Sequence, residues 1–539
     1  MMVSKLLLLL ISYLIVPYSI WGLYYHSIAK MRDLLDVEHV FADKFFDYLD
    51  AEEKRLQNLE NFVLEVEGVV RDSSKNEALF VSNPANVYLL FKRFVENWPN
   101  TKELYGKNKN TSLTPMNGIL RGLEIVKDFL PDQLELRGTV LSLIKLQHMY
   151  QVSPAEFSDG FGNAPELGYE DMFEIGARAE RLLYFPESFS WFEELLKRWP
   201  RGNDTKVIGK TSLGLNISRF ETLNYISYVA YEIGNLEAAE LYGREAVHVS
   251  PTEQMVYNYR WYVYDLHRSV TNPSVRKKFR RIRESLSPFL DRYDSLCREE
   301  EQMPQHVKNR LLCYFSTPHP RFTITPLKVE VIYDGDPYVV AYRHFVGDKE
   351  VDRIIELTKP YLKRAQAYNP ETGKPEDVDY RIAGNAWISG AKHPVVNNFV
   401  IRVGDAVNLN MFTAEPLQMG NYGIAGNYDP HCDHVRLVNS SAFGIYGKWG
   451  NRMSTALVYF SDVERGGQTV FVNTEKGVIM RPEKGTFLFW HNLYRNGTGN
   501  NRTEHAACPV LLGEKWIANL WIHERGQEFT RPCDLENDF

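Results

Sequence analysis

The chain has 539 residues, 13% of them aromatic, and a formal net charge of −7 from 62 basic and 69 acidic side chains. At roughly 150 residues per domain, this length predicts three or four domains with well-filled cores. Acidic and basic residues are interspersed, without the basic stripe that binds a nucleic-acid backbone, so nucleic acid is not an expected partner.

The amino-terminal stretch MMVSKLLLLLISYLIVPYSIWG combines Lys5 with an apolar run that Pro17 interrupts. This pattern predicts a secretory signal peptide over residues 1–22. The run is shorter than the ~20 apolar residues of a spanning helix, although residues 18–24 could extend it, so a signal anchor is the alternative. No later stretch is expected to enter a membrane.

Sequons and cysteines both fit a secretory lumen. Glycosylation would be available at Asn110, Asn203, Asn216, Asn439, Asn496 and Asn501. Two pairs of cysteines each flank a short segment: Cys297 with Cys313, and Cys508 with Cys533. This spacing predicts two local disulfides, although four cysteines allow three pairings. Cys432 is the fifth cysteine.

Helical patterns are expected over residues 23–150. From Phe45, apolar residues recur at alternating spacings of three and four; the series continues through Leu49, Leu56, Leu59, Val63, Val66 and Val70. Such a heptad seam predicts a coiled coil. An ordinary amphipathic core helix is the alternative.

A second helical domain is expected over residues 165–265. The small residues and the proline of a tetratricopeptide helix pair stand at the expected offsets, as Gly234, Ala239, Ala246 and Pro251. Two or three such repeats would form a concave groove. On one helix, tyrosines recur at spacings of three, as Tyr225, Tyr228 and Tyr231. They suit core packing or the docking of proline-rich peptides, and both readings stay open.

After a helical linker over residues 266–327, residues 328–539 read as short strands separated by turns. TALVYFSDV, GTFLFWHN and KWIANLWIH are the strongest strand signals, and GDKEVDRIIELTKPYL predicts a helix outside the sheets. The expected fold is α+β and multidomain. All-helical domains precede a double-stranded β-helix, or jelly roll.

A metal site is predicted in YDPHCDH, residues 428–434. On a strand, His431 and Asp433 project to one face while His434 points away. His505 is the candidate third ligand. Two histidines and one carboxylate on Fe(II) leave three positions open, two for a chelating 2-oxo acid and one for O₂. A zinc hydrolase with the same three ligands is an alternative.

The strand KWIANLWIH places Lys515, Trp521 and His523 on one face by parity. A lone lysine is usually a solvated surface charge. Here Lys515 could supply the cation that the far carboxylate of a 2-oxo acid needs. The combination favours catalysis.

With these motifs, the chain resembles the alpha subunits of collagen prolyl 4-hydroxylases nearly end to end. The resemblance is carried by DYLDAEEKRL, YRIAGNAWISG, LQMGNYGIAGNYDPHCD, GGQTVF, GTFLFWHNLY and HAACPVLLGEKWIANLWIHERGQEFTRPC. It implies a procollagen-proline 4-dioxygenase that hydroxylates X-Pro-Gly repeats with 2-oxoglutarate and O₂, giving succinate and CO₂. L-ascorbate would rescue oxidised iron.

The resemblance also implies residue roles. Fe(II) would be held by His431, Asp433 and His505. The co-substrate 2-oxoglutarate would meet Lys515 at its 5-carboxylate, His523 near its 1-carboxylate, and Tyr422 and Thr469 beside it. The peptide would contact Tyr428, Arg452 and Trp521, and the repeat region would bind it through the three tyrosines.

The same resemblance implies that the amino-terminal helical region dimerises. It also implies protein disulfide isomerase as the beta subunit, in an alpha2beta2 or alpha-beta assembly in the lumen of the endoplasmic reticulum. The end PCDLENDF carries no retention signal of its own, which agrees with retention by such a partner.

Local departures from the family pattern leave two further readings open. Cys432 and His434 stand where the family has aromatic residues, Glu504 stands where it has a basic one, and the loop 438–451 diverges. The substrate could therefore be non-collagen proline-rich secreted proteins. A non-catalytic scaffold for proline-rich chains is the other alternative.

Overall fold

The computed structural model describes residues 28–99, 133–200, 206–211, 214–272, 288–301, 303–369, 374–377, 381–435 and 448–534. The expected signal peptide, the sequons at Asn110, Asn203 and Asn439, and most of the divergent loop lie outside these residues. The chain divides into two compact units. The first comprises residues 1–76 and 100–116, and the second comprises residues 77–99 and 117–539. Among the described helices, none is both long and apolar enough to cross a lipid bilayer.

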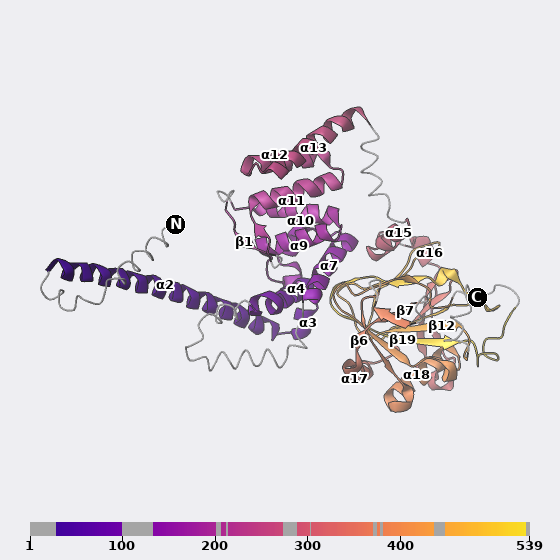
Figure 1. Ribbon diagram of the computed structural model, residues 1–539. Coiled ribbons are helices and arrows are strands. Elements are labelled where there is room, and N and C mark those ends of the chain that lie inside the picture. Colours follow the sequence, from indigo (N-terminus) through magenta and orange to yellow (C-terminus); the bar gives the residue numbers. More distant parts are fainter. Residues whose placement is uncertain are drawn as a thin grey trace. The chain divides into compact units, whose positions relative to one another are not determined.

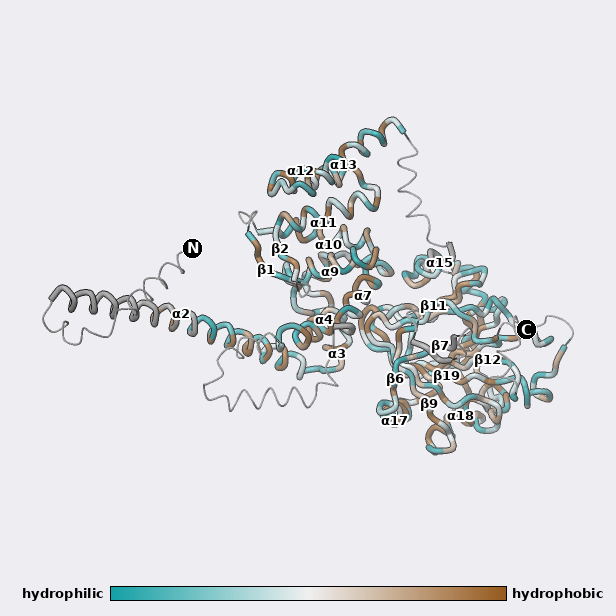
Figure 2. The backbone as a smooth tube through the Cα atoms, in the orientation of Figure 1, coloured by the Kyte–Doolittle hydropathy of each residue, from teal (hydrophilic) through white to brown (hydrophobic). Residues whose placement is uncertain are grey.

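In the described part of the first unit, the chain forms one helix, α2 (Ile28–Ser73), which is 46 residues long. No proline interrupts it, so its backbone hydrogen bonds can run unbroken. Figure 2 shows hydrophilic and hydrophobic residues interleaved along its described part. Four residues of the expected heptad seam are between 50% and 60% exposed, namely Leu49, Leu56, Val63 and Val70. These four seam residues therefore face solvent in the single chain.

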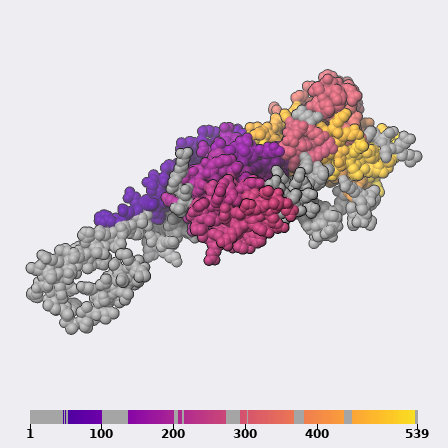
Figure 3. Space-filling view, turned by 90° about the horizontal axis from the view of Figure 1, so that it is seen from above, coloured from indigo at the N-terminus to yellow at the C-terminus, as the bar shows by residue number. Residues whose placement is uncertain are grey.

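Helices make up most of the second unit up to residue 271 (Figure 1). They are α3 (Glu77–Val81), α4 (Pro84–Lys92), the π-helical turn η2 (Arg93–Asn97), α7 (Gln133–Tyr150), α8 (Pro154–Ser158), the 3-10 turn η4 (Phe161–Asn163), α9 (Tyr169–Arg181), α10 (Phe185–Arg198), α11 (Arg219–Glu232), α12 (Leu236–Val249) and α13 (Glu253–Thr271). The short strands β1 (Gly209–Lys210) and β2 (Asn216–Ile217) form a hairpin before α11. From α9 to α13 each helix packs against the next. Their atoms form one continuous purple-to-magenta surface in Figure 3.

The helix pair expected up to Pro251 is observed as α11 and α12. The side chains of Ser218 and Asn235 cap the two helices by accepting backbone N–H groups. Ala239 and Ala246 are fully buried between helices. Gly234 has a φ of +77°, which glycine adopts without strain in the turn that joins the pair.

The remainder of the second unit is rich in strands. A nine-stranded sheet has the order β3-β4-β5-β16-β12-β19-β10-β9-β6, and a four-stranded sheet has the order β11-β17-β14-β15. The first comprises β3 (Cys313–Ser316), β4 (Leu327–Tyr333), β5 (Val339–Arg343), β6 (Lys363–Arg364), β9 (Gly384–Ile388), β10 (Leu417–Tyr422), β12 (Arg452–Tyr459), β16 (Phe487–His491) and β19 (Lys515–His523). The second comprises β11 (Tyr428–His431), β14 (Thr469–Phe471), β15 (Val478–Met480) and β17 (His505–Ala507). Two further two-stranded pairs complete the set: the consecutive strands β7 (Gln366–Asn369) and β8 (Lys374–Asp377), and the distant strands β13 (Arg465–Gly466) and β18 (Val510–Leu512).

Every strand pairing between these elements is antiparallel, and the arrangement is consistent with the expected jelly roll. The expected outer helix is α17 (Asp348–Thr358), which packs with α18 (Pro394–Val407) on one face of the large sheet. Even-numbered residues of β12 and β19, such as Ala456 and Leu520, belong to that core. Odd-numbered ones, such as Leu457 and Ile517, face the other way. Because side chains alternate along a strand, Lys515, Trp521 and His523 share this second face, as expected.

The disulfide corrects the expected pairing. Cys297 at the end of α15 (Pro288–Cys297) bonds to Cys508, 211 residues away, with Cα atoms 5.6 Å apart. Cys313 and Cys533 are exposed and unbonded, so the two local pairs predicted from spacing are wrong. The reason is tertiary, because α15 packs through Leu296 onto the strands around Val470, and this places its last residue against Cys508. Helix α16 (Gln305–Lys308) and β3 follow within the expected linker.

Candidate metal and co-substrate site

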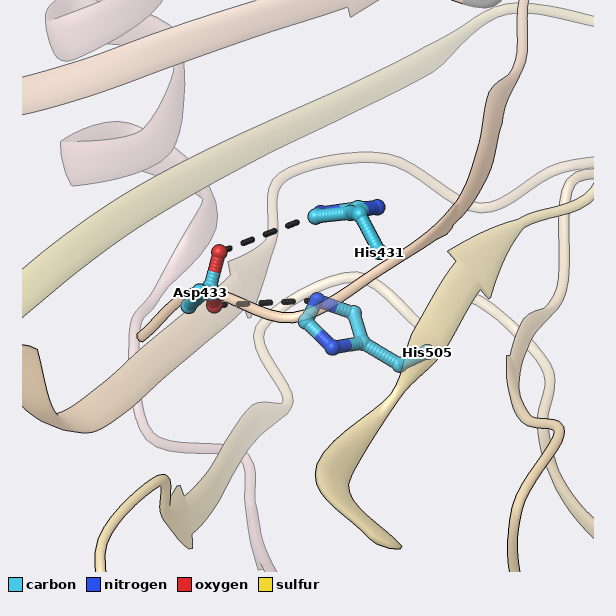
Figure 4. Close-up of side chains that lie close together, drawn as sticks. All are labelled: His431, Asp433 and His505. Carbon is cyan, nitrogen blue, oxygen red and sulfur yellow. Dashed lines mark ion pairs between the residues drawn. The ribbon is translucent and has the colours of Figure 1, made fainter. Parts of the chain in front are cut away.

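Two adjacent strands bring the three expected metal ligands together. His431 ends β11 and His505 begins β17, and the two residues are direct partners in the antiparallel pairing. Asp433 lies two residues beyond β11. Its Oδ1 is 3.8 Å from Nε2 of His431, and its Oδ2 is 3.6 Å from Nε2 of His505. Figure 4 shows both rings turned toward the carboxylate.

The potential ligand atoms of these three residues all lie within 4.8 Å of one another. In the part of the chain that the structure describes, no other group of three histidine, cysteine or carboxylate residues is placed to hold an ion. The donor set of two imidazoles and one carboxylate is the facial arrangement that suits Fe(II) with open coordination positions.

Backbone carbonyls fix the tautomer of both histidines. Nδ1 of His431 lies 2.8 Å from the carbonyl oxygen of Asp429, and Nδ1 of His505 lies 2.9 Å from that of Thr503. A carbonyl can only accept, so each Nδ1 carries the proton and each Nε2 presents a lone pair. Burial lowers the pKa of His431 well below its ordinary value. Its ring is therefore neutral and ready to ligate.

Lys515, the lysine expected to meet the co-substrate, is buried. Lys515 begins β19, is 1% exposed, and donates from Nζ to the carbonyl of Gly467 at 2.6 Å. Burial lowers its pKa to about 7. Among the residues described, no carboxylate pairs with it. A buried cation without an anionic partner is costly unless a ligand supplies the charge, so this lysine fits the 5-carboxylate of 2-oxoglutarate.

Aromatic and hydroxyl groups surround this lysine. Its Nζ lies 5.4 Å from the ring centre of Tyr422 and 5.8 Å from that of Tyr459. The Tyr459 hydroxyl donates to Oγ1 of Thr469 at 2.8 Å. The structure thus places Tyr422 beside Lys515, and Thr469 next to it through Tyr459. Tyr459 was missed by sequence reasoning, because an apolar strand gives no sign of which tyrosine faces a site.

Two of the three residues expected to contact the peptide, Arg452 and Trp521, lie with His523 around an acidic side chain that the sequence did not single out. Glu415 accepts two hydrogen bonds from Arg452, at 2.6 and 3.0 Å. The guanidinium carbon of Arg452 lies 3.9 Å from the ring centre of Trp521. His523 Nε2 is 3.3 Å from the same carboxylate, and its Nδ1 is 2.7 Å from the carbonyl oxygen of Gly450.

Tyr428 lies at the metal end of the same region. Its ring stacks on His431 with centroids 3.5 Å apart, and the guanidinium carbon of Arg381 lies 4.5 Å from its centre. Arg381 also donates to Gln418 at 3.1 Å. Arg381 stands in YRIAGNAWISG, a stretch quoted for the resemblance, but sequence reasoning gave it no role. The tyrosine is therefore placed directly beside a ligand, where a bound substrate would meet the metal.

The structure also describes the surroundings of the three residues near the metal ligands that differ from the family pattern. Cys432 is half-buried, whereas His434 is 4% exposed and is not one of the grouped ligands. A Cβ built on Gly499 would lie 2.3 Å from Cδ2 of His434, so this glycine makes room for the ring. Glu504 accepts from Nδ2 of Asn473 at 2.6 Å.

The three tyrosines of α11 separate into two groups. Tyr225 packs against Phe173 and Phe192, with ring centroids 5.6 and 5.3 Å away. Tyr231 donates to Asp265 at 2.6 Å and is half-buried. Tyr228 is 38% exposed. It is therefore the tyrosine most available to a ligand.

Comparison with known proteins gives consistent matches over the whole chain. The N-terminal region of the prolyl 4-hydroxylase alpha-subunit matches residues 27–164, and the 2OG-Fe(II) oxygenase superfamily matches residues 417–523. Prolyl 4-hydroxylase subunit alpha-1 of Homo sapiens is 33% identical over 532 residues, covering 95% of this chain and 96% of that protein. Subunit alpha-2 of Caenorhabditis elegans is 34% identical over 530 residues, covering 95% and 93%. A solved structure, viral collagen prolyl hydroxylase vCPH from Paramecium Bursaria Chlorella virus-1 with 2OG, is 22% identical over 34% of this chain and 94% of its own, with a TM-score of 0.27.

Proposed function

The chain belongs to the prolyl 4-hydroxylase alpha-subunit family, and from that premise we propose that it hydroxylates X-Pro-Gly repeats of unfolded procollagen. The activity itself is Fe(II)- and 2-oxoglutarate-dependent 4-hydroxylation of proline. The observation that carries the assignment to these residues is the His431, Asp433 and His505 group in the same domain as a buried, carboxylate-free Lys515. A zinc hydrolase with the same three ligands predicts no requirement for 2-oxoglutarate.

The proposal assigns a role to each residue of the site. His431, Asp433 and His505 hold the metal through two Nε2 atoms and one carboxylate. Lys515 binds the 5-carboxylate of 2-oxoglutarate, and burial on all sides keeps water from that end of the site. Bound iron with 2-oxoglutarate and O₂ supplies the oxidising chemistry, in which the co-substrate becomes succinate and CO₂.

The remaining site residues position the co-substrate and the peptide. Tyr422 and Thr469 line the co-substrate beside the lysine, and His523 serves its 1-carboxylate. Tyr428, Arg452 and Trp521 form the peptide-facing rim, with Glu415 orienting the arginine through two hydrogen bonds. Because Arg452 covers the Trp521 ring, the rim offers a flat cationic and aromatic surface to a proline-rich strand.

The helical parts serve binding and assembly in this proposal. Helices α9–α13 form a tetratricopeptide-like domain over residues 165–265 that binds proline-rich chains through Tyr228, with Tyr225 and Tyr231 supporting it from half-buried positions. The exposed seam of α2 is the coiled coil of a dimerisation domain over residues 23–150. Residues 266–327 link these domains to the catalytic domain of residues 328–539.

The cellular setting is part of the same proposal. A signal peptide over residues 1–22 directs the chain to the lumen of the endoplasmic reticulum, where protein disulfide isomerase is its beta subunit and L-ascorbate its reductant. The disulfide between Cys297 and Cys508 suits an oxidising compartment. Asn216, Asn496 and Asn501 are exposed, as glycan acceptors must be.

The test is a mass gain of one oxygen per site on a (Pro-Pro-Gly) repeat peptide, dependent on O₂ and 2-oxoglutarate, with His505→Ala as the control. The chain is co-expressed with protein disulfide isomerase. Oxygen gain that the variant loses supports the proposal. Peptide binding without oxygen gain in an iron-loaded preparation would instead favour a scaffold, and gain only on non-collagen proline-rich peptides would change the substrate class.

A further inference from the structure

One of the three metal ligands is held by a side chain that the sequence did not mark. Thr455 lies on β12, on the strand face opposite the α17 and α18 core, and is 1% exposed. Its hydroxyl donates to Oδ2 of Asp433 at 2.6 Å. An ionised carboxylate can only accept, so the single hydroxyl proton of Thr455 is committed to this bond.

A second buried residue supports the hydroxyl. Asn492 directly follows β16, is fully buried, and donates from Nδ2 to Oγ1 of Thr455 at 2.8 Å. The amide must present its NH₂ group here, because the hydroxyl proton already points to Asp433. The chain of donors therefore runs in one direction, from Asn492 through Thr455 to Asp433.

The backbone of Asn492 is itself anchored on both sides. Its N–H donates to the carbonyl of Met453 at 2.7 Å, and its carbonyl accepts from the N–H of Asn500 at 2.9 Å. Asn500 in turn accepts from the hydroxyl of Thr503, whose own carbonyl fixes His505. One segment, residues 492–503, thus supports two of the three ligands.

Asp433 needs such support more than the histidines do. It lies beyond the end of β11, so no strand ladder fixes its backbone, and its carboxylate can rotate about the Cβ–Cγ bond. We propose that Thr455 and Asn492 are positioning residues that set the orientation of the Asp433 carboxylate and thereby the affinity of the site for a divalent metal. Partners of this kind beyond the ligands themselves commonly change metal affinity.

The inference rests on the proposed metal site but not on the peptide substrate. Its test is an anaerobic Co(II) titration of the full-length chain, without 2-oxoglutarate or peptide, followed by the visible absorption of the bound ion. Thr455→Val removes the donor at constant shape, Thr455→Ser retains it, and Asn492→Asp replaces the NH₂ group by an acceptor that competes for the hydroxyl proton.

We expect Thr455→Val and Asn492→Asp to weaken Co(II) binding about 10- to 100-fold and to alter the absorption band, with Thr455→Ser close to wild type. The melting temperature of the metal-free Thr455→Val protein should fall, because the buried Asp433 carboxylate and Asn492 amide each lose a hydrogen bond, and its rise on Co(II) addition should shrink as well. Wild-type affinity and spectrum in both disruptive variants would overturn the proposal. A drop in metal-free stability with unchanged Co(II) affinity would assign the pair a structural role instead.

If Thr455→Val fails to fold, the comparison of Thr455→Ser with Asn492→Asp decides the question by the same measurements. Failure of the wild-type chain to oxidise a collagen-like peptide would leave the Co(II) result intact. The two proposals therefore fail separately.

Discussion

Binding of 2-oxoglutarate should be coupled to the uptake of one proton by Lys515. Burial lowers the pKa of this lysine from 10.5 to about 7, which means that the ammonium form is disfavoured by about 5 kcal/mol. A carboxylate at hydrogen-bond distance restores the charged form and raises the pKa again. Above pH 7, binding of the co-substrate dianion must therefore be accompanied by the uptake of a proton from solvent onto Lys515.

The size of the pH effect on 2-oxoglutarate affinity follows from the pKa of Lys515. Between pH 7 and pH 8.5 the protonated fraction of a lysine with a pKa of about 7 falls from one half to about 3%, so the affinity for 2-oxoglutarate should fall by about 15-fold if only the ammonium form binds. Isothermal titration calorimetry with Mn(II)-loaded protein, in two buffers of different ionisation enthalpy, measures both the affinity and the number of protons taken up. Lys515→Met should lose about 100-fold or more in affinity through loss of a charged hydrogen bond, and should lose the pH dependence with it.

The pH dependence of the unfolding free energy, measured without co-substrate, gives an independent check on the direction of the Lys515 pKa shift. The unfolded chain protonates this lysine below 10.5, whereas the folded chain does so only below about 7. The folded state therefore binds fewer protons in this window, and the contribution of Lys515 to the free energy of unfolding should rise with pH between 7 and 10.5. Enthalpies that do not depend on the buffer, together with pH-independent affinity, would refute the reasoning.

Other side chains make separate predictions. Gly499→Ala should destabilise the fold by about 1–3 kcal/mol in a denaturant titration, because its Cβ would overlap the His434 ring, and adding His434→Ala should recover most of the loss. In a series of repeat peptides, KM should fall less steeply with peptide length in Tyr228→Ala than in the wild type. Tyr225→Ala removes a ring packed between two phenylalanines and should mainly lower the melting temperature. An unchanged length dependence in Tyr228→Ala would show that this tyrosine does not bind the peptide. Cys297→Ser should cost about 3–5 kcal/mol, since the bond closes 211 residues of chain, and equal unfolding free energies with and without reductant would contradict this.

The sequence alone determined the periodic and short-range features. The strand KWIANLWIH is β19 from its first residue to its last, and its parity placed Lys515, Trp521 and His523 on one face, because side chains in a strand alternate strictly. The H-x-D spacing marked His431 and Asp433 as a ligand pair, but β11 ends at His431, so strand alternation does not account for the position of Asp433. The helix pair α11 and α12 followed from small residues and a proline at tetratricopeptide offsets, which act within a few positions.

Features that depend on which distant segments meet were settled only by the tertiary structure. Cysteine spacing predicted local pairs, but the packing of α15 beside β14 and β15 decides that Cys297 meets Cys508. Glu415, Thr455 and Asn492 carry no sequence pattern, because a buried polar residue is recognisable only by the partner that satisfies it. Those partners lie 37, 22 and 37 residues away along the chain. Local spacing fixes the direction of a side chain, whereas packing between the two sheets decides what that side chain meets.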